Sequence, residues 1–334
     1  MLNVTLDLSE KLQVVTFTPG PYNYHFPLPL APNFKIVQAK KRPPFDRDTQ
    51  KIVENADIYL LENNPDYNKT KRKYAWIFDI VENSGKPWIV TEGPLFRKNH
   101  VKAPWQGSYY RWSWYSYFRD KGNYCNANSP GDRWKRIQQE QNITIHNWKK
   151  DRGDYILFMM QRPGDTSLGP AIDQYGNYGN FIFRTIQRIR LKTDRPIRIR
   201  LHPQNHNAQL PLLKNILKYK NVSISDGTEQ IQHKSVEGGD NLEKDILGAW
   251  AVVGLNSNSL TESCCLGIPT WSLHPSSMAW EASHTDLNQL EYPNLHIDRT
   301  QWLYNLGYTQ WRQDEVIAGL PFKHLLKEWN SING

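Results

Sequence analysis

Short apolar runs alternate with helical stretches through the second half of this 334-residue chain, and that alternation most restricts its fold. Residues 155–160 form a continuous apolar run typical of a buried parallel strand, and residues 180–192 carry an apolar stripe at helical spacing. Such alternation predicts a doubly wound α/β domain, whose ligands bind beyond the C-terminal ends of its strands. The other expected strands are residues 196–201, 222–225, 250–255 and 270–273, and the other expected helices are residues 210–219, 242–248 and 260–266.

The first half shows a weaker alternation that also predicts an α/β domain with a parallel sheet. Residues 99–150 have little periodicity, and we interpret them as the end of this domain and a connection. We expect a first domain over residues 1–150, a second over 151–312, and a C-terminal helix in 313–334 that packs back across their junction. The expected strands of the first half are residues 13–18, 34–38, 57–62 and 87–91, and its expected helix is residues 73–84.

Composition excludes several classes of protein. The chain is 39% hydrophobic, which is enough for packed cores and excludes a disordered protein. No window approaches 18 apolar residues, so no transmembrane helix is expected, and residues 1–15 lack the apolar core of a signal peptide. Cys125, Cys264 and Cys265 are too few for a disulfide framework. We therefore expect a soluble protein of a reducing compartment, the cytoplasm.

The basic charge of the chain lies in its first half. Residues 1–150 contain 23 Lys and Arg against 14 Asp and Glu, a net charge of +9. Residues 151–334 contain 18 against 19, a net charge of −1. A basic half favours a polyanionic partner such as nucleic acid, an anionic glycan or an anionic membrane surface, although a generic solubility charge is the alternative.

Polar residues follow the strand at residues 155–160, where a doubly wound sheet places its ligand groups. An Arg in this loop can meet a phosphate together with hydroxyl and amide groups. An ordinary polar loop is the alternative interpretation. The candidate ligand-binding residues here are Gln161, Arg162, Asp165, Thr166 and Ser167.

Small hydrogen-bonding residues also follow the strand at residues 250–255. Ser257, Asn258 and Ser259 would lie at a helix N-terminus, where free N–H groups favour a phosphate. Glu262 could hold ribose hydroxyls, although Ser259 and Glu262 also have the spacing of a capping box that needs no ligand. His202 precedes a proline at a third strand end and would project into the same crevice, although a lone His is more often structural.

The order of these motifs resembles the nucleotide-sugar half of GT-B glycosyltransferases, especially capsular-polysaccharide and Kdo-transferase-like proteins. The resemblance covers residues 155–275 and implies two Rossmann-like doubly wound domains that face a central cleft. It also implies a nucleotide-sugar co-substrate, most simply a UDP-sugar, with no metal or other cofactor. Leu201 departs from the family pattern, which often has Lys there. The motifs are Gln161 with Asp165-Thr166-Ser167, then Arg200-Leu201-His202-Pro203, then Asn256-Ser257-Asn258-Ser259 with Glu262 and Gly267-Ile268-Pro269.

A narrower resemblance is to phage-encoded glycosyltransferase-like proteins, several of which decorate hydroxymethylated pyrimidines in phage DNA. It implies a double-stranded DNA acceptor, in the cytoplasm of an infected bacterium, whose target base is flipped out of the duplex. The motifs that carry it are Thr91-Glu92-Gly93-Pro94-Leu95-Phe96-Arg97, Asp132-Arg133-Trp134, Trp302-Leu303, and Tyr308-Thr309-Gln310-Trp311 with Glu315.

Aromatic residues interleaved with Arg over residues 105–119 suit nucleic acid, since cations meet phosphates and rings stack on exposed bases. A glycan acceptor and a packed aromatic cluster are the alternatives. Basic clusters near expected strand ends could track a phosphate backbone, although such runs usually form a solvated face. The candidate nucleic-acid-binding residues are Lys40, Lys41, Arg42, Arg47, Arg97, Lys98, Trp105, Tyr109, Arg111, Trp112 and Trp114.

Transfer of a sugar also needs a base for the acceptor hydroxyl. Glu92 is the first candidate because it directly follows a strand of the acceptor domain, and Asp46 is the second, with Asp79 and Asp120 as weaker candidates. The sequence therefore predicts a glycosyltransferase that modifies hydroxymethylated DNA. The alternatives are a capsule or lipopolysaccharide sugar transferase with a CMP- or UDP-sugar donor, and a non-catalytic DNA-binding protein.

Overall fold

The computed structural model describes residues 12–18, 34–38, 43–62, 75–96, 109–203, 205–226 and 239–333. The chain divides into two compact units. The first comprises residues Met1–Leu95, His100–Trp134 and Tyr304–Gly334, and the second comprises Phe96–Asn99 and Lys135–Leu303. These units differ from the expected ranges, since residues 135–150 group with the second unit and residues 304–312 with the first. Within the described ranges, no helix is both long and apolar enough to cross a membrane.

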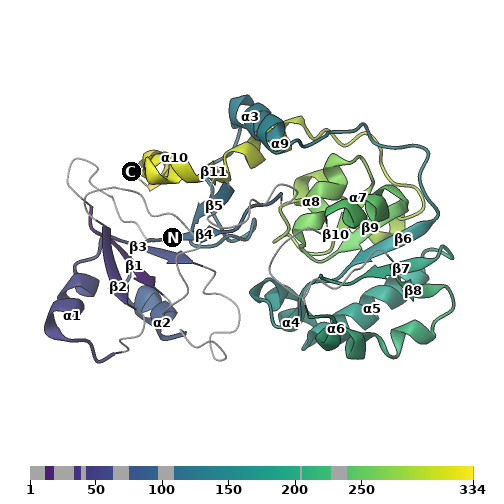
Figure 1. The fold of residues 1–334 in the computed structure, drawn as a ribbon, viewed down its shortest axis with the longest axis horizontal. Helices are drawn as coiled ribbons and strands as arrows, with labels where there is room; N and C mark the ends of the chain where they lie inside the picture. Colours follow the sequence, from purple (N-terminus) through teal and green to yellow (C-terminus); the bar gives the residue numbers. More distant parts are fainter. Residues whose placement is uncertain are drawn as a thin grey trace. The chain divides into compact units, whose positions relative to one another are not determined.

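The second unit contains a parallel sheet with the strand order β10-β9-β6-β7-β8. The chain first runs outward from β6 to β8 and then returns to place β9 on the other side of β6, so the order reverses between β6 and β9. Helices α7 and α8 cover one face, and α4, α5 and α6 cover the other (Figure 1). The elements are β6 Tyr155–Met159, α4 Gly169–Tyr175, α5 Tyr178–Arg190, β7 Ile197–Arg200, α6 His206–Leu213, β8 Val222–Ile224, α7 Gly239–Leu247, β9 Ala249–Gly254, α8 Asn258–Cys265 and β10 Thr270–Ser272.

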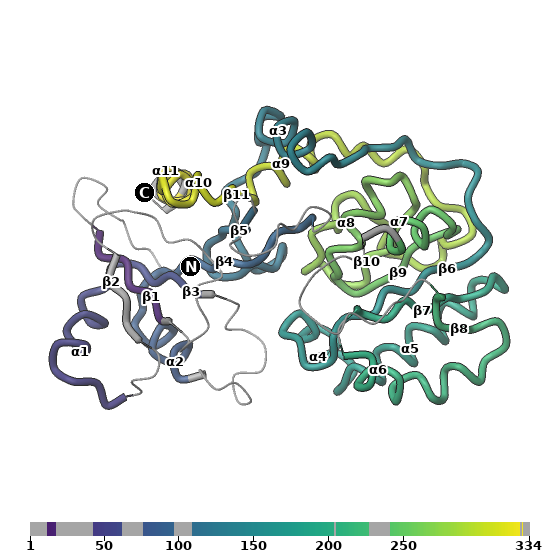
Figure 2. The backbone as a smooth tube through the Cα atoms, viewed as in Figure 1, coloured from purple at the N-terminus to yellow at the C-terminus, as the bar shows by residue number. Residues whose placement is uncertain are grey.

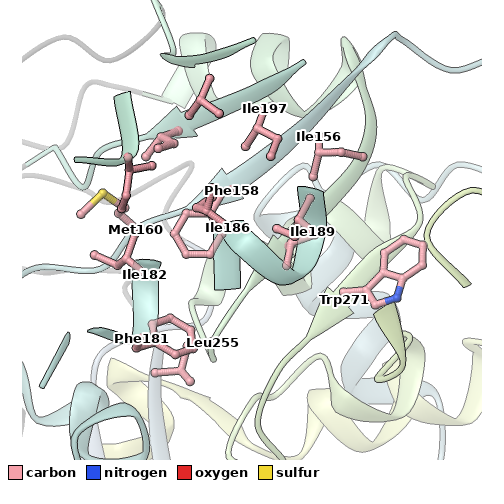
Figure 3. Packing of buried hydrophobic residues seen from close by; sticks show 14 of the residues in the cluster. Ile156, Phe158, Met160, Phe181, Ile182, Ile186, Ile189, Ile197, Leu255 and Trp271 are labelled. Atoms are coloured by element: carbon pink, nitrogen blue, oxygen red, sulfur yellow. The ribbon is translucent and has the colours of Figure 1, made fainter. Parts of the chain in front are cut away.

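The core of the second unit joins its strands to α5. Phe158 of β6 and Ile197 of β7 pack against Ile182, Ile186 and Ile189 of the helix (Figure 3). The three isoleucines follow the helical spacing that predicted this stripe. Burial of both faces explains why the central strands β6 and β9 are continuous apolar runs rather than alternating ones.

The first unit contains a sheet with the strand order β11-β5-β4-β3-β1-β2. Strands β1 to β4 are parallel, as expected, whereas β5 and β11 are antiparallel to their neighbours. Successive side chains point to opposite faces, so Leu60 packs with α11 and its neighbour Leu61 with α1 and α2. The elements are β1 Val14–Thr18, β2 Phe34–Gln38, α1 Arg47–Glu54, β3 Ile58–Glu62, α2 Ala75–Asn83, β4 Trp88–Glu92, β5 Tyr109–Trp114, β11 Gln310–Arg312, α10 Gln313–Ile317 and α11 Leu320–Asn333, while α3 Asp132–Glu140 and α9 Thr300–Gly307 each have residues in both units.

Strand β5 corrects the interpretation of the aromatic segment. Trp112 and Trp114 are fully buried, Tyr109 is 2% exposed, and Arg111 is 6% exposed. The Arg111 guanidinium donates to the Gly93 carbonyl over 2.8 Å instead of facing solvent. The predicted nucleic-acid contacts are therefore wrong for these four residues, because side chains packed inside a sheet cannot stack on bases or reach phosphates. The packed aromatic cluster is the alternative that the structure supports.

The C-terminal part of the chain returns to complete the first sheet. Strand β11 pairs with β5, so residues far apart in the sequence lie side by side (Figure 2). The Trp329 ring of α11 lies 4.4 Å from the Trp114 ring of β5. Arg133 makes a bidentate ion pair with Glu315, at 2.8 and 2.9 Å, and its guanidinium lies 3.9 Å from the Trp311 ring. Two of the motifs that resemble phage-encoded proteins, the one with Arg133 and the one with Trp311 and Glu315, therefore stabilise this unit.

We predict that Trp114→Ala lowers the free energy of unfolding by about 3–5 kcal/mol, because it removes a fully buried indole and its packing against Trp329. Denaturant unfolding followed by circular dichroism measures the change. Tyr292→Ala is the matched control, because that side chain is 89% exposed and should change stability by less than about 0.5 kcal/mol. Equal effects of the two substitutions would contradict the placement of β5 in the core.

Candidate functional site

Two side-chain amides bridge the point where the second sheet reverses its order. Gln161, just after β6, donates from Nε2 to Asn256 Oδ1 over 2.8 Å and to Ser167 Oγ over 2.7 Å. Asn256, just after β9, donates from Nδ2 to the Ser167 carbonyl over 3.0 Å and to Ser276 Oγ over 2.8 Å. Ligands of doubly wound sheets bind at this reversal. The candidate site is therefore built on the C-terminal ends of β6 and β9.

The backbone of Gln161 is also held. Its N–H donates to the Tyr178 hydroxyl over 2.7 Å, and burial raises the pKa of Tyr178. The phenol therefore stays neutral over the ordinary pH range. Gln161 itself is buried, and its Oε1 has no hydrogen-bond partner among the described residues.

The loop after β6 ends in a short 3-10 turn, Thr166–Leu168, before α4. Asp165 caps that turn, and its Oδ1 accepts the Ser167 N–H over 2.9 Å. Thr166 is buried, whereas Arg162 is exposed to solvent. This geometry joins Gln161, Asp165 and Ser167 in one hydrogen-bonded loop and leaves the Arg162 guanidinium at its surface.

Helix α8 starts directly after the second strand end. Ser257 is its N-cap and accepts the Ser259 N–H over 3.3 Å. The capping-box alternative for Ser259 and Glu262 is therefore wrong, because Ser259 lies inside the first turn and Glu262 lies beyond the position that a capping box uses. Asn258 and Ser259 lie in that first turn, at the end of the helix whose dipole favours negative charge.

His202 follows β7, and two hydrogen bonds from the Gln209 side chain, called here the Gln209 clamp, hold its backbone. Gln209 of α6 accepts the His202 N–H over 2.8 Å and donates to the His202 carbonyl over 2.9 Å. Gln209 is fully buried, so the two bonds are shielded from water. His206 begins the same helix, and burial lowers its pKa, which favours the neutral ring. The structure therefore fixes the main chain of His202 at the edge that carries the other candidates.

Arg200, in the motif that precedes His202, has a structural role. It is buried and forms an ion pair with Asp245 of α7. Ser225, which follows β8, donates to the same carboxylate over 2.6 Å. A buried ion pair with these partners ties α7 to the ends of β7 and β8, and loss of either charge would leave the other unpaired.

The arrangement suits an anionic ligand. In the described ranges, no group of three or more His, Cys, Asp and Glu side chains is placed to hold a metal ion. The first turn of α8 and the capped turn after β6 both lie after strands of this sheet, and the dipole of a helix N-terminus favours an anion. The site can therefore hold an anionic group and contact neighbouring hydroxyls.

The candidate bases lie on the first unit. Glu92 ends β4, where its Oε1 accepts the Gly93 N–H over 2.7 Å and its register partner in β5 is Arg111. Asp46 is the N-cap of α1 and accepts the Thr49 N–H over 2.8 Å. Asp79 and Asp120 are exposed on α2 and on the turn after β5. Arg47, in the first turn of α1, is exposed, whereas Lys40, Lys41, Arg42, Arg97, Lys98 and Trp105 lie outside the described residues.

Four residues of the site were missed as candidates from the sequence. Asn256 precedes the candidates Ser257, Asn258 and Ser259, and its structural role appears only in the hydrogen bonds that it makes. Gln209 carries no motif, since it acts from inside a helix. Ser276 and His274 follow β10, and the signal for them was a second His-Pro pair, His274-Pro275, at a strand end like that of His202.

We predict that Gln209→Leu lowers the free energy of unfolding by about 2 kcal/mol, because a side chain of similar size no longer satisfies the His202 N–H and carbonyl. Amide hydrogen exchange at His202 should accelerate in the same variant. Gln174→Leu on α4 is the control, because Gln174 is exposed. An unchanged exchange rate at His202 in Gln209→Leu would show that the hydrogen bonds of Gln209 do not hold this backbone.

No model of a protein family matches the sequence, and no curated protein matches it. Solved structures similar to this chain include two glycosyltransferase domains that share its fold over nearly the whole length. The β-Kdo 2,4 transferase KpsC of Thermosulfurimonas dismutans aligns with a TM-score of 0.55 and 12% identity, over 95% of this chain and 98% of that chain. The β-Kdo 2,7 transferase KpsC of the same organism aligns with a TM-score of 0.51 and 12% identity, over 95% and 99%. The expected GT-B fold, with two Rossmann-like α/β domains, is confirmed.

Proposed function

We propose that this protein is a glycosyltransferase whose nucleotide-sugar donor binds at the C-terminal ends of β6 and β9. The observation that carries the proposal is the Gln161–Asn256 bond at the reversal of the sheet, beside the first turn of α8. A phosphate suits the positive dipole end of this helix, and a polar network suits the hydroxyls of a nucleotide. We propose a UDP-sugar as the donor, and Arg162, Asp165, Thr166, Ser167, His202, Ser257, Asn258, Ser259 and Glu262 as further contacts.

The chemistry follows from these groups. As the bond between the sugar and the diphosphate breaks, negative charge grows on the leaving phosphate, and the dipole of α8 stabilises it. The acceptor hydroxyl loses a proton to a carboxylate. We propose Glu92 for that role, with Asp46 as the second candidate, although the carboxylate of Asp46 already caps α1.

The acceptor we propose is polyanionic. The basic residues of the first half support this, although residues 97, 98 and 135–150, which carry +5 of the +9 charge of residues 1–150, belong to the second unit; a hydroxymethylated pyrimidine flipped out of DNA is the acceptor we favour. Burial of Tyr109, Arg111, Trp112 and Trp114 leaves charge as the support for DNA. An anionic capsule or lipopolysaccharide glycan is the second candidate, favoured by the fold shared with the Kdo transferases KpsC.

We expect UDP or a UDP-sugar to raise the melting temperature, because a ligand that binds the folded state stabilises it by mass action. The shift of the melting temperature is measured with CMP-sugars and GDP-sugars as well. Radiolabelled sugar should then pass to DNA that contains hydroxymethylcytosine and not to unmodified DNA. Transfer to a lipid-linked glycan alone would replace the DNA acceptor with the second candidate. Salt-sensitive DNA binding without any nucleotide binding would favour a non-catalytic DNA-binding protein.

We also expect Glu92→Gln to keep nucleotide binding while lowering turnover by at least about 100-fold, the usual contribution of a general base. Single-turnover transfer with the same labelled donor measures the loss. Asp48→Asn, on the exposed side of α1, is the matched control and should transfer at the normal rate. Near-normal turnover by the Glu92 variant would remove that residue from the mechanism.

A further inference from the structure

The outer surface of α5 and α6 is strongly basic, although the half of the chain that contains it is not. Between Asp173 and Asp226 the chain has ten Lys and Arg against a single acidic residue, Asp194, a net charge of +9. Residues 151–334 together carry −1, so the remaining residues of this half carry −10. Six exposed cations on the two helices and the segments that follow them form what we call the α5–α6 basic surface: Arg184, Arg188, Lys192, Lys214, Lys218 and Lys220.

The packing of the second unit brings these cations together. Arg184 and Arg188 are one turn apart on α5, on the side away from its buried isoleucines. Gln187, on the same exposed side, donates from Nε2 to the Tyr219 hydroxyl over 3.3 Å. Two lysines of the basic surface flank Tyr219 in the sequence, so the cations after α6 adjoin those of α5.

The basic surface is not neutralised by ion pairs. None of its six cations forms an ion pair with an acidic side chain in the described parts of the chain. Asp286 borders the surface: the Asn288 N–H lowers the pKa of this carboxyl most, and Lys192 and Arg188 lower it further. A group of uncompensated cations on one side of a protein attracts polyanions.

Exposed apolar side chains stand among the cations. Leu191, which ends α5, is 80% exposed, and two leucines of α6 and the 3-10 turn after it are 42% and 38% exposed. Tyr292 is 89% exposed and follows Glu291, which accepts a hydrogen bond from Thr193 near the end of α5. Four of the five exposed large hydrophobic side chains of the described residues therefore lie on or beside this surface.

We propose that the α5–α6 basic surface binds an anionic phospholipid bilayer, with its cations at the lipid phosphates and Leu191 inserted at the boundary of the acyl chains. Cations near an anionic bilayer and apolar side chains that enter it both strengthen peripheral binding. A nucleic acid supplies phosphates but no apolar phase, so it gives the exposed leucines no partner. The proposal goes beyond the proposed function, because no residue of this surface is a candidate for donor or acceptor binding.

The apolar part of this surface lies away from the candidate site. Helix α5 begins at Tyr178, whose hydroxyl accepts the Gln161 N–H, and its 13 residues span about 20 Å. Its other end leads through Thr193 to the start of β7. Leu191 is therefore near the edge of the sheet where the strands begin, whereas the candidate site is at the edge where they end. A bilayer bound at Leu191 leaves the donor site accessible.

Flotation with vesicles of phosphatidylcholine and phosphatidylglycerol, compared with vesicles of phosphatidylcholine alone, tests the proposal. We expect the wild type to bind the anionic vesicles and to be released as the salt concentration rises. Arg188→Glu should weaken this binding about tenfold, and Leu191→Ser about threefold. Both side chains are exposed, so circular dichroism should show that both variants keep the native fold.

Lys244→Glu, at an exposed lysine of α7 on the other face of the sheet, is the matched control for charge. Leu320→Ser on α11 is the control for loss of an exposed leucine. Both control variants should bind vesicles like the wild type. A wild type that does not bind anionic vesicles, or equal binding by Arg188→Glu and Lys244→Glu, would overturn the proposal.

Binding of duplex DNA separates the other polyanion. DNA binding that Arg188→Glu weakens and Leu191→Ser leaves unchanged, without binding to vesicles, would assign the surface to nucleic acid and overturn the bilayer proposal. The rise in melting temperature with UDP should be the same in Arg188→Glu as in the wild type, because this surface is not part of the donor site. Failure of vesicle binding and failure of nucleotide binding are therefore measured independently.

Discussion

Gln161 and Asn256 meet because the sheet of the second unit reverses its order between β6 and β9. The connections on either side of a reversal leave in opposite directions, so no helix covers the strand ends there. Side chains have to fill the space, and polar ones must satisfy one another when they are shielded from water. Ser167, Ser276 and the backbone of Ser167 supply the remaining partners. The position of the candidate site thus follows from topology, and the choice of amides and hydroxyls follows from burial.

The first unit depends on a different constraint. Its sheet contains a strand of large aromatic side chains, and Trp112 and Trp114 need apolar partners on the covered face. Helix α11 supplies Leu325 and Trp329, and the Trp114 indole donates to the Leu325 carbonyl over 3.2 Å. Arg133 and Glu315 lock the returning segment to the rest of the unit. The same residues that suggested a nucleic-acid surface therefore form the interior of this unit.

The elements of the second unit could be predicted from the sequence because its strands and helices each bury an apolar run or stripe. The loop after β6 was harder, since α4 is short and opens with Gly169-Pro170. Strand β5 was missed although Tyr110, Trp112 and Trp114 recur every second residue, because Arg111 is buried between them. Strand β11 has three residues and gains its partner only in the folded chain, so no local pattern marks it.

The same limits apply to the candidate site. Gln161 and Ser257 stand just after strands, where ligand groups of this fold lie, and Ser167 lies in the same loop as Gln161, so the sequence marks their place although their binding roles stay predictions. The clamp by Gln209 could not, since one buried glutamine in a helix has no signature until its partner at His202 is known. The capping of α8 by Ser257 rather than Ser259 depends on where the helix begins, and sequence patterns place helix ends only to within a few residues.

The pairing of β11 with β5 also has a consequence for the order in which the chain folds as it is synthesised. Residues 135–303, which form nearly all of the second unit, are contiguous and can fold as soon as they leave the ribosome. The first unit is begun earlier, yet its sheet has an open edge at β5 and an uncovered aromatic face until β11 and α11 arrive. An unpaired strand edge with exposed aromatic side chains is prone to aggregate. The first unit is therefore begun before the second unit but reaches its native structure after it. Until β11 and α11 are synthesised, the exposed edge and aromatic face of β5 have to be kept from aggregating.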